Sequence, residues 1–241
     1  MISVCMATYN GERFIKQQID SILPQLSEED ELIISDDGST DRTLEIIASY
    51  EDKRIKVLHR NKTGNKYYPT LKVCYSTSNF ENALKSAKGD YIFLSDQDDI
   101  WENSKIKHSL ELLKTYDYVI HNFSVIDENG NLLNKKYYKK PPLKFTPKKD
   151  ILHPNFWGCC SCFRKEILLN ALPIPEKICL HDLWIGLVAE KLGKCFWNDS
   201  VLIKHRISKT NTSSGLKKSE NSLILKIRYR LNALSTLKEK I

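Results

Sequence analysis

The chain has 241 residues, a length that suits one large α/β domain or a domain with a short appendage. Hydrophobic residues make up 41% of the sequence and aromatic residues 10%, which is ordinary for a globular protein with a buried core. The formal net charge of +7 leaves nucleic acid, an anionic membrane surface and anionic substrates open as partners.

Several kinds of segment are not found in the sequence. No apolar run reaches the roughly 18 residues of a membrane-spanning helix. A secretory signal would begin with a charged leader and an apolar stretch, but residues 2–7 at this place have the pattern of a strand. We therefore expect a cytoplasmic protein, and no disulfide framework. Cys159, Cys160 and Cys162 crowd together, but they lack the spacing and the histidine partners of a zinc site, and a buried strand is the better interpretation.

The first hundred residues alternate between strand-like and helix-like patterns. Short apolar runs typical of buried parallel strands lie at 2–7, 32–34, 55–58 and 91–94. Apolar residues at helical spacing predict helices over 14–23, 43–50 and 80–87. This alternation predicts a parallel sheet with right-handed crossovers. The polar, tyrosine-rich stretch 61–78 is interpreted as a surface loop.

The pattern changes after Lys114. Further strands are predicted at 118–125, 156–163, 195–197 and 201–203. Helices are predicted at 164–171 and 183–192, with Gly193 as the stop of the second. A turn at 128–131 and a basic, proline-containing loop at 134–149 separate these elements. Without an internal repeat or a linker, the two halves are expected to share one continuous sheet.

Polar residues follow three of the first four predicted strands. They are Thr8, Tyr9, Asn10, Gly11 and Glu12 after the first strand, residues 35–41 after the second and residues 96–99 after the fourth. Ligands of a parallel sheet lie at the carboxyl ends of its strands, so these residues would share one edge. Turn formation and capping by Ser39, Thr40 or Asp41 are local alternatives. Local roles do not explain why carboxylates, which repel one another, recur at one edge.

The pattern Asp96-x-Asp98-Asp99 has the chemistry of a cation site. Carboxylates two positions apart, just beyond a buried strand, can converge on a hard cation. Mg²⁺ and Mn²⁺ prefer oxygen ligands and commonly keep one or two carboxylates together with substrate phosphates. Such a cation would neutralise a diphosphate leaving group.

These motifs resemble those of a known enzyme family. They are Ala7-Thr8-Tyr9-Asn10-Gly11, Ser35-Asp36-Asp37-Gly38-Ser39-Thr40-Asp41 and Phe93-Leu94-Ser95-Asp96-Gln97-Asp98-Asp99-Ile100-Trp101. The set resembles family 2 glycosyltransferases with the GT-A fold, and Asp-Gln-Asp-Asp-Ile-Trp resembles their rhamnosyltransferase-type branch. Asn155–Cys159 and His181–Trp184 are similar to the acceptor-side Gly-Cys and His-Asp-x-Trp motifs of that branch. The resemblance implies an α/β fold with a Rossmann-like, mostly parallel sheet flanked by helices.

The resemblance also implies roles on the donor side. The residues similar to those around the nucleobase and ribose are Thr8, Tyr9, Asn10 and Glu12. Asp37 resembles the aspartate that accepts a hydrogen bond from the pyrimidine N3–H, which would select uracil or thymine. Asp96 resembles the ribose-side or water-mediated metal position, and Asp98 the direct ligand of Mg²⁺ or Mn²⁺. The donor implied is therefore a dTDP- or UDP-sugar.

On the acceptor side, the resemblance makes Asp182 the catalytic base. An acceptor hydroxyl must attack the anomeric carbon, and a nearby carboxylate can take its proton. Capping of the following helix is the structural alternative for Asp182. The residues expected near the acceptor or behind the metal ligands are Asp99, Trp101, Gly158, Cys159, His181 and Trp184.

One segment departs from the branch, whose members often carry Tyr-Arg-x-His near residue 205. Here the sequence is His205-Arg206-Ile207-Ser208, so the arginine matches and Ser208 stands at the histidine position. Either a shift in the chain lets His205 serve, or Arg206 makes the phosphate contact.

The resemblance covers about residues 1–213. We expect 1–101 to bind the nucleotide sugar, 102–213 to bind a saccharide acceptor, and 214–241 to form a basic amphipathic tail. In this tail the apolar residues that can share a helical face are Leu223, Ile224, Ile227, Leu231, Leu234 and Ile241. Such a helix is typical of membrane-surface binding, and a lipid-linked acceptor would make attachment of 216–241 to the inner membrane useful. Packing on the domain or on a dimer partner is the alternative.

Two other functions compete with sugar transfer. A sugar nucleotidyltransferase of similar fold usually carries a Gly-rich, basic phosphate loop after its first strand, where this chain has Thr8-Tyr9-Asn10-Gly11. A non-catalytic nucleotide-binding module is allowed by the charge. The lysines are spread through loops and tail without a recognition motif, so we expect no nucleic acid partner.

Overall fold

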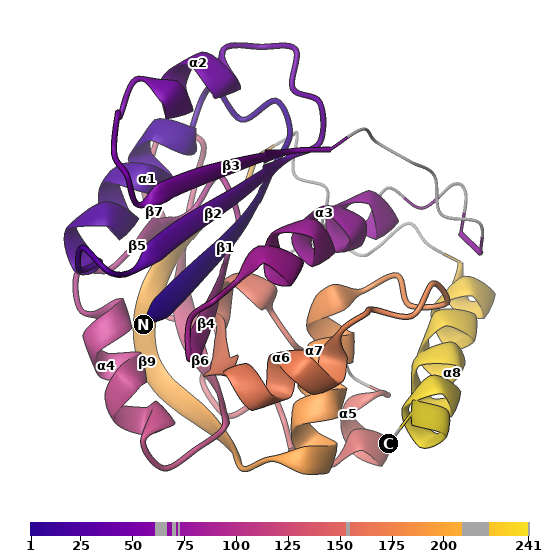
Figure 1. Ribbon diagram of the computed structural model, residues 1–241. Helices are drawn as coiled ribbons and strands as arrows, with labels where there is room; N and C mark the ends of the chain where they lie inside the picture. The colour runs from indigo at the N-terminus through magenta and orange to yellow at the C-terminus, as the bar shows by residue number, and fades with distance from the viewer. Residues whose placement is uncertain (61–66, 69–70, 72, 153–154, 209–221, 241) are drawn as a thin grey trace.

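The computed structural model describes the chain except for residues 61–66, 69–70, 72, 153–154, 209–221 and 241 (Figure 1). Within the described residues, nine strands form one sheet in the order β3-β2-β1-β4-β8-β6-β9-β5, with β7 paired to β6. This confirms that the two halves share one sheet. Every described helix is too short or too polar to span a bilayer.

The first half is a parallel βα unit, as the alternating pattern predicts. Its strands are β1 (Ile2–Thr8), β2 (Glu31–Asp36), β3 (Ile55–His59) and β4 (Tyr91–Ser95), and neighbouring strands run parallel. Its helices are α1 (Ile15–Ile22), followed by the 3-10 turn η1 (Leu23–Gln25), α2 (Thr43–Ala48) and α3 (Val73–Ser86). Val4, Cys5 and Met6 are fully buried because helices cover both faces of β1.

The second half adds strands of both directions. Its strands are β5 (Ile100–Trp101), β6 (Tyr118–Ile126), β7 (Leu132–Asn134), β8 (Ser161–Arg164) and β9 (Cys195–Arg206). Its helices are α4 (Lys105–Leu113), α5 (Pro147–Asp150), the 3-10 turn η2 (Gly158–Cys160), α6 (Lys165–Ala171), α7 (His181–Leu192) and α8 (Leu223–Lys240). Strand β8 is antiparallel to β4 and β6, whereas β9 is parallel to β6. The sheet is therefore parallel in its first half and mixed in its second.

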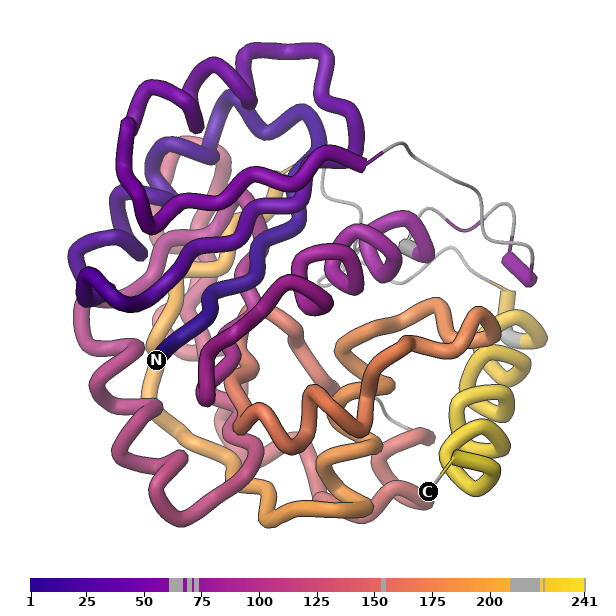
Figure 2. Tube along the Cα trace, in the orientation of Figure 1, coloured from indigo at the N-terminus to yellow at the C-terminus, as the bar shows by residue number. Residues whose placement is uncertain are grey.

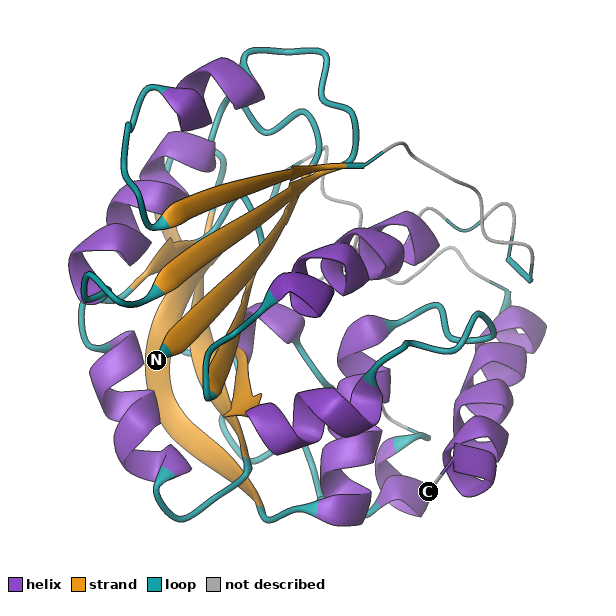
Figure 3. Cartoon of the chain, viewed as in Figure 1, coloured by secondary structure: helices purple, strands orange, loops and turns teal. Residues whose placement is uncertain are grey.

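The helices form layers on the two faces of the sheet (Figures 1 and 3). Helices α1, α2 and α4 cover one face, and α3, α6 and α7 cover the other, with α8 outside α7. The trace in Figure 2 shows the amino terminus entering the sheet and the carboxyl end on the outside, beyond α7. The carboxyl ends of β1, β2 and β4 therefore open toward α3 and the start of α7.

Helix α3 corrects the predicted loop at 61–78, because it begins at Val73 and not near Phe80. The rest of the predicted loop includes residues outside the described part of the chain. The polar residues that suggested a loop have buried partners: the Thr77 hydroxyl donates to the Cys179 carbonyl at 2.8 Å, and Asn79 Nδ2 donates to the Thr8 carbonyl at 3.1 Å. These polar residues therefore link α3 to the segment before α7 and to the end of β1.

Other boundaries also differ from the sequence-based expectation. The strand expected over 156–163 begins as the turn η2, and only β8 is extended. The two strands expected at 195–197 and 201–203 are the single strand β9, whose pairing with β6 is irregular around Asn122. Helix α4 was not predicted, and α5 interrupts the expected basic loop. Gly193 ends α7 with an extended backbone, φ −130°, and not in the left-handed conformation.

Candidate active site

The loops after β1, β2 and β4 are tied together by hydrogen bonds at one edge of the sheet. Gln97, just beyond β4, accepts hydrogen bonds from the Thr8 hydroxyl at 2.5 Å and from the Tyr9 backbone N–H at 2.9 Å. Asn10 joins the loop after β2, since its N–H donates to Ser39 Oγ at 2.8 Å and its side chain accepts from the Thr40 N–H at 2.9 Å. The three predicted polar groups therefore do share one edge.

The turn after β2 holds Asp37 in a buried position. Asp36 accepts the N–H groups of Gly38 and Ser39, and Gly38 has a φ of +83° that favours glycine. The Asp37 N–H donates to the Thr8 carbonyl at 3.0 Å, and its carboxylate forms an ion pair with Arg60. Arg60 follows β3 and was not singled out from the sequence, because its link to Asp37 depends on the pairing of β2 with β3.

Tyr9 is one of the exposed residues of the loop after β1, with 43% of its surface accessible. Thr8 is buried and its hydroxyl is used by Gln97. The Glu12 carboxylate accepts the Arg42 N–H at 3.0 Å, at the start of α2. The aromatic ring of Tyr9 therefore lies at the surface of this loop, whereas Thr8 lies beneath it.

Asp99 forms a buried ion pair with His205 of β9. Its Oδ1 lies 2.8 Å from His205 Nδ1 and accepts the Arg206 backbone N–H at 3.1 Å. Burial alone would lower the pKa of His205, but the adjacent Asp99 carboxylate raises that pKa above its usual range. The same contact holds the pKa of Asp99 low despite its burial. The sequence left open whether His205 or Arg206 serves in the site. In the structure, His205 is a charged partner of the acidic cluster.

Asp96 and Asp98 keep raised pKa values, although the charge of His205 partly offsets the rise in both. Burial raises the pKa of Asp98, and the charges of Asp99 and Asp96 raise it further. Burial and the charge of Asp99 likewise raise the pKa of Asp96. Carboxylates held in this state gain most from a divalent cation, so the residues present fit Mg²⁺ or Mn²⁺.

Cys159 is also close to the cluster. Ligand atoms of Asp99, Cys159 and His205 all lie within 4.8 Å of one another, so these residues form a second possible metal-binding set. A hydrogen bond to Cys160 and burial raise the pKa of the Cys159 thiol well above its usual range. Because a thiol must lose its proton to bind a metal, the oxygens of Asp96 and Asp98 suit a hard cation better.

Asp182 lies in the first turn of α7, next to His181 and Gly158. The helix begins at His181 with Leu180 at the N-cap, so the predicted N-cap position of Asp182 is wrong, but its carboxylate still accepts the Leu183 N–H of the first turn at 2.7 Å. Burial raises the pKa of Asp182 to about 7, which suits a general base at neutral pH. A Cβ added at Gly158 would lie 3.1 Å from His181 Nε2 and 3.6 Å from the Asp182 Cβ, so the glycine lets this segment approach closely.

His181 is a neutral neighbour of Asp182. Its ring stacks on Phe80 with a centroid distance of 4.1 Å, and burial lowers its pKa to about 3. Its backbone N–H donates to the Thr77 hydroxyl at 3.2 Å. His181 therefore shapes the site without carrying charge.

Three predicted site residues lie in the core. Trp184 is fully buried and its indole N–H donates to the Ala171 carbonyl at 2.9 Å. Trp101 is 2% exposed and packs on Phe93 and beneath the Lys105 ammonium. These two tryptophans support the site from behind and do not face an acceptor.

Arg206 is the third predicted site residue that lies in the core. It is 1% exposed, and its guanidinium donates to the carbonyls of Asp98, Asp127 and Glu128 and to the Gln17 side chain. This arrangement fixes the backbone of Asp98 and does not favour the predicted phosphate contact. Lys105, fully buried, acts in the same way on the acceptor side, because its Nζ donates to the Cys159 carbonyl at 2.6 Å.

Comparison with known sequences identifies related proteins. The model of the family described as glycosyl transferase family 2 matches residues 3–170. The dTDP-rhamnosyl transferase RfbG of Shigella flexneri is 31% identical over 194 residues, 75% of this chain and 63% of that protein. The UDP-Glc:alpha-D-GlcNAc-diphosphoundecaprenol beta-1,3-glucosyltransferase WfgD of Escherichia coli is 27% identical over 220 residues, 89% of this chain and 80% of that protein. The chain spans 66% of the length of a Rickettsia typhi relative and 36% of a Rickettsia felis one.

Solved structures with a similar fold include two bound to nucleotide sugars. Staphylococcus aureus TarS 1–349 in complex with UDP-GlcNAc has a TM-score of 0.70 at 21% identity, covering 97% of this chain and 66% of that one. The mannosyltransferase PcManGT of Pyrobaculum calidifontis, in complex with GDP-Man and Mn²⁺, has a TM-score of 0.58 at 16% identity, covering 98% and 69%. At these identities the likeness shows the fold, which is the GT-A fold expected from the sequence.

Proposed function

This chain belongs to glycosyl transferase family 2, and we propose that it is an inverting glycosyltransferase. It moves a sugar, rhamnose or another hexose, from a dTDP- or UDP-sugar to a saccharide acceptor in the synthesis of a cell-surface polysaccharide such as capsule or O-antigen. The observation that carries the proposal is the gathering of Asp37, the Asp96–Asp99 cluster and Asp182 around one sheet edge. Relatives with dTDP-rhamnosyl and UDP-Glc activities in their names support the choice of donors.

The donor base binds beside Tyr9 and Asp37. Asp37 offers a carboxylate acceptor and its ion-pair partner Arg60 offers N–H donors, a combination that complements the N3–H and O4 edge of uracil or thymine. The exposed ring of Tyr9 supplies a surface for stacking. Gln97 keeps Tyr9 in register with the acidic cluster through its hydrogen bonds.

Asp98, with Asp96 beside it, holds Mg²⁺ or Mn²⁺. The cation, when bound, stabilises negative charge on the departing nucleoside diphosphate. Two neighbouring residues support this cation site. His205 forms an ion pair with Asp99, and Arg206 donates a hydrogen bond to the Asp98 carbonyl. Two carboxylates whose pKa values are raised by burial and mutual repulsion are left for the cation.

Asp182 is the catalytic base. Its carboxylate accepts the proton of the acceptor hydroxyl as that oxygen bonds to the anomeric carbon, and the bond from this carbon to the diphosphate breaks. Gly158 lets its segment pack closely against Asp182 and His181, and Lys105 holds the Gly158–Cys159 segment in place through the Cys159 carbonyl.

The enzyme works on the cytoplasmic side of the membrane. We place residues 1–213 in the catalytic domain and 214–241 in a tail that attaches to the inner-membrane surface, near a lipid-linked acceptor. The boundary between these parts lies outside the described residues. A relative named for transfer to a diphosphoundecaprenol-linked sugar supports this setting.

Release of UDP or dTDP from a panel of pyrimidine-diphosphate sugars, with Mn²⁺ or with EDTA, tests the proposal. We expect one donor to be turned over only with the cation, and Asp182→Asn to lose turnover while still binding nucleotide. Asp90→Asn is the matched control, because Asp90 precedes the opposite end of β4 and is exposed. Pyrophosphate release from a nucleoside triphosphate and a sugar phosphate would indicate a nucleotidyltransferase instead, and full turnover by Asp182→Asn would contradict the role of the base.

A further inference from the structure

Helix α8 has two apolar faces, and the domain uses one of them. On the inner face, Ala233 and Leu237 are buried, and Leu225 and Tyr229 pack against a cluster that includes Tyr68 and Cys179. Polar contacts fix the same face: Asn232 Nδ2 donates to the Tyr68 hydroxyl at 2.7 Å. The Lys240 ammonium donates to the carbonyls of Ala171, Leu172 and Pro173. The helix is therefore anchored at both ends.

The outer face carries a stripe of exposed apolar side chains. Ile224, Ile227 and Leu231 are 80%, 46% and 59% exposed. Their spacing of three and four residues places them on one side of the helix, opposite Ala233 and Leu237. The helix does pack on the domain, as the alternative to membrane binding expects, but these three residues of the predicted apolar face lie outside that packing. Because the inner face already holds α8, folding of the described chain does not account for the stripe.

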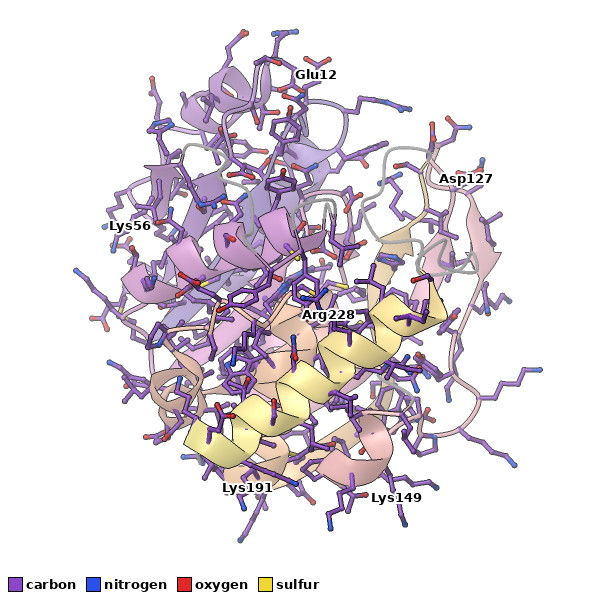
Figure 4. All side chains as sticks on the ribbon, turned by 90° about the vertical axis from the view of Figure 1, so that its right-hand side faces the viewer. Glu12, Lys56, Asp127, Lys149, Lys191 and Arg228 are labelled. Carbon is purple, nitrogen blue, oxygen red and sulfur yellow. The ribbon has the colours of Figure 1, made fainter. Side chains whose placement is uncertain are left out.

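Exposed basic side chains, Arg228 and Lys238, lie on the same helix as this stripe. Helix α8 carries five basic residues and one acidic residue. Figure 4 shows α8 across the face turned to the viewer, with Arg228 on it, Lys149 of α5 beside its lower part and Lys191 of α7 below its end. Lys148, Lys149 and Leu152 at α5 are also exposed, the leucine by 61%. Apolar and cationic groups thus share one side of the molecule.

We propose that this side, formed by Ile224, Ile227 and Leu231 of α8 and by Lys148 and Lys149 of α5, is a docking surface for an anionic lipid bilayer. Apolar side chains that enter the acyl boundary and lysines that reach the headgroups are the features of an interfacial helix. A second copy fits poorly, because it would bring the basic side chains of two α8 helices together. A three-residue stripe is also small for a stable protein interface of about 800 Å² on each partner.

The surface lies close to the acceptor side of the candidate active site. The cluster that receives Leu225 and Tyr229 includes Cys179, which precedes Asp182 by three residues. The Cys179 carbonyl accepts the Thr77 hydroxyl of α3. Docking through α8 would therefore hold the start of α7 near the headgroups, where a lipid-linked acceptor presents its saccharide. This orientation and the attachment of the tail both rest on the proposed function, but lipid binding by the surface is measured without sugar transfer.

Flotation of the whole chain with two kinds of vesicle tests the surface. We expect binding to vesicles of phosphatidylcholine with phosphatidylglycerol and little binding to phosphatidylcholine alone. The variant Ile224→Ser/Ile227→Ser/Leu231→Ser and, separately, Lys148→Glu/Lys149→Glu should each weaken binding by about tenfold or more. Leu132→Ser/Leu133→Ser is the matched control, because these leucines of β7 are 51% and 61% exposed and lie away from α8. It should bind as the unaltered chain does.

Thermal unfolding and UDP binding, measured on the same variants, should be unchanged, because the substituted residues are exposed and outside the active site. Equal flotation of the α8 variant and the unaltered chain would overturn the proposal. So would equal binding to both kinds of vesicle, or a dimer in solution that the α8 substitutions convert to monomer. Failure of nucleotide binding in the unaltered chain would instead count against the proposed function.

Discussion

Replacement of His205 by leucine should lower the free energy of unfolding by more than the loss of one ordinary hydrogen bond would. Asp99 is fully buried, and His205 is the charged side chain that lies 2.8 Å from its carboxylate. Removal of one partner from a buried ion pair leaves an uncompensated charge, which costs about 3–5 kcal/mol. Urea denaturation at pH 6 in EDTA should show a loss of this size for His205→Leu. The double variant Asp99→Asn/His205→Leu should recover most of it, because the asparagine oxygen still accepts the Arg206 N–H.

The pH dependence of this stability has a definite sign. Asp99 raises the pKa of His205 in the folded protein above the value of about 6.5 for an unfolded chain. The pair therefore contributes fully between about pH 4 and about pH 6.5. Its contribution falls as the pH rises toward the folded-state pKa of His205, and also at low pH as Asp99 gains a proton. His205→Leu should lack this fall. A loss of less than 1 kcal/mol, or a double variant as unstable as the single one, would refute the reasoning.

Three further predictions follow from the site. The kcat for transfer should rise as the pH increases through about 7, because burial raises the pKa of Asp182 to that value and the base acts as the carboxylate. The variant Asp182→Asn should lower kcat by about 10²-fold or more, and its kcat should no longer rise with pH in this range. Gly186→Ala should lower stability by about 1–3 kcal/mol in thermal unfolding, since its Cβ would lie 2.3 Å from the Phe156 ring. Gln97→Ala should raise the KM for the donor by about tenfold with a smaller change in kcat, because Thr8 and Tyr9 lose their hydrogen bonds to the loop after β4. An unchanged KM would contradict this role.

The strands and the acidic cluster were predictable because each has a local signal. The apolar runs at β1, β2, β3 and β4 are short, bounded by polar residues and separated by helical spacing. The aspartates follow directly from these strands. Position at a parallel strand end is enough to bring them to one edge, whatever the loops do.

The ion pairs of the site were not predictable, because their partners are far apart in the chain. His205 and Asp99 are separated by 106 residues and meet because β9 pairs with both β5 and β6. Arg60 meets Asp37 through the pairing of β3 with β2. The polar first half of α3 was mistaken for a loop, since Thr77 and Asn79 find buried backbone partners that the sequence does not reveal.

Calorimetric titration of UDP and of dTDP, with and without Mn²⁺, tests the central claim most directly. If Asp98 holds a cation that binds the diphosphate, Mn²⁺ should tighten nucleotide binding to the unaltered chain by about tenfold or more and should have little effect on Asp98→Asn. The control Asp90→Asn should respond to Mn²⁺ as the unaltered chain does. Nucleotide binding that ignores Mn²⁺, or that Mn²⁺ tightens equally in Asp98→Asn, would contradict the assignment of the metal site.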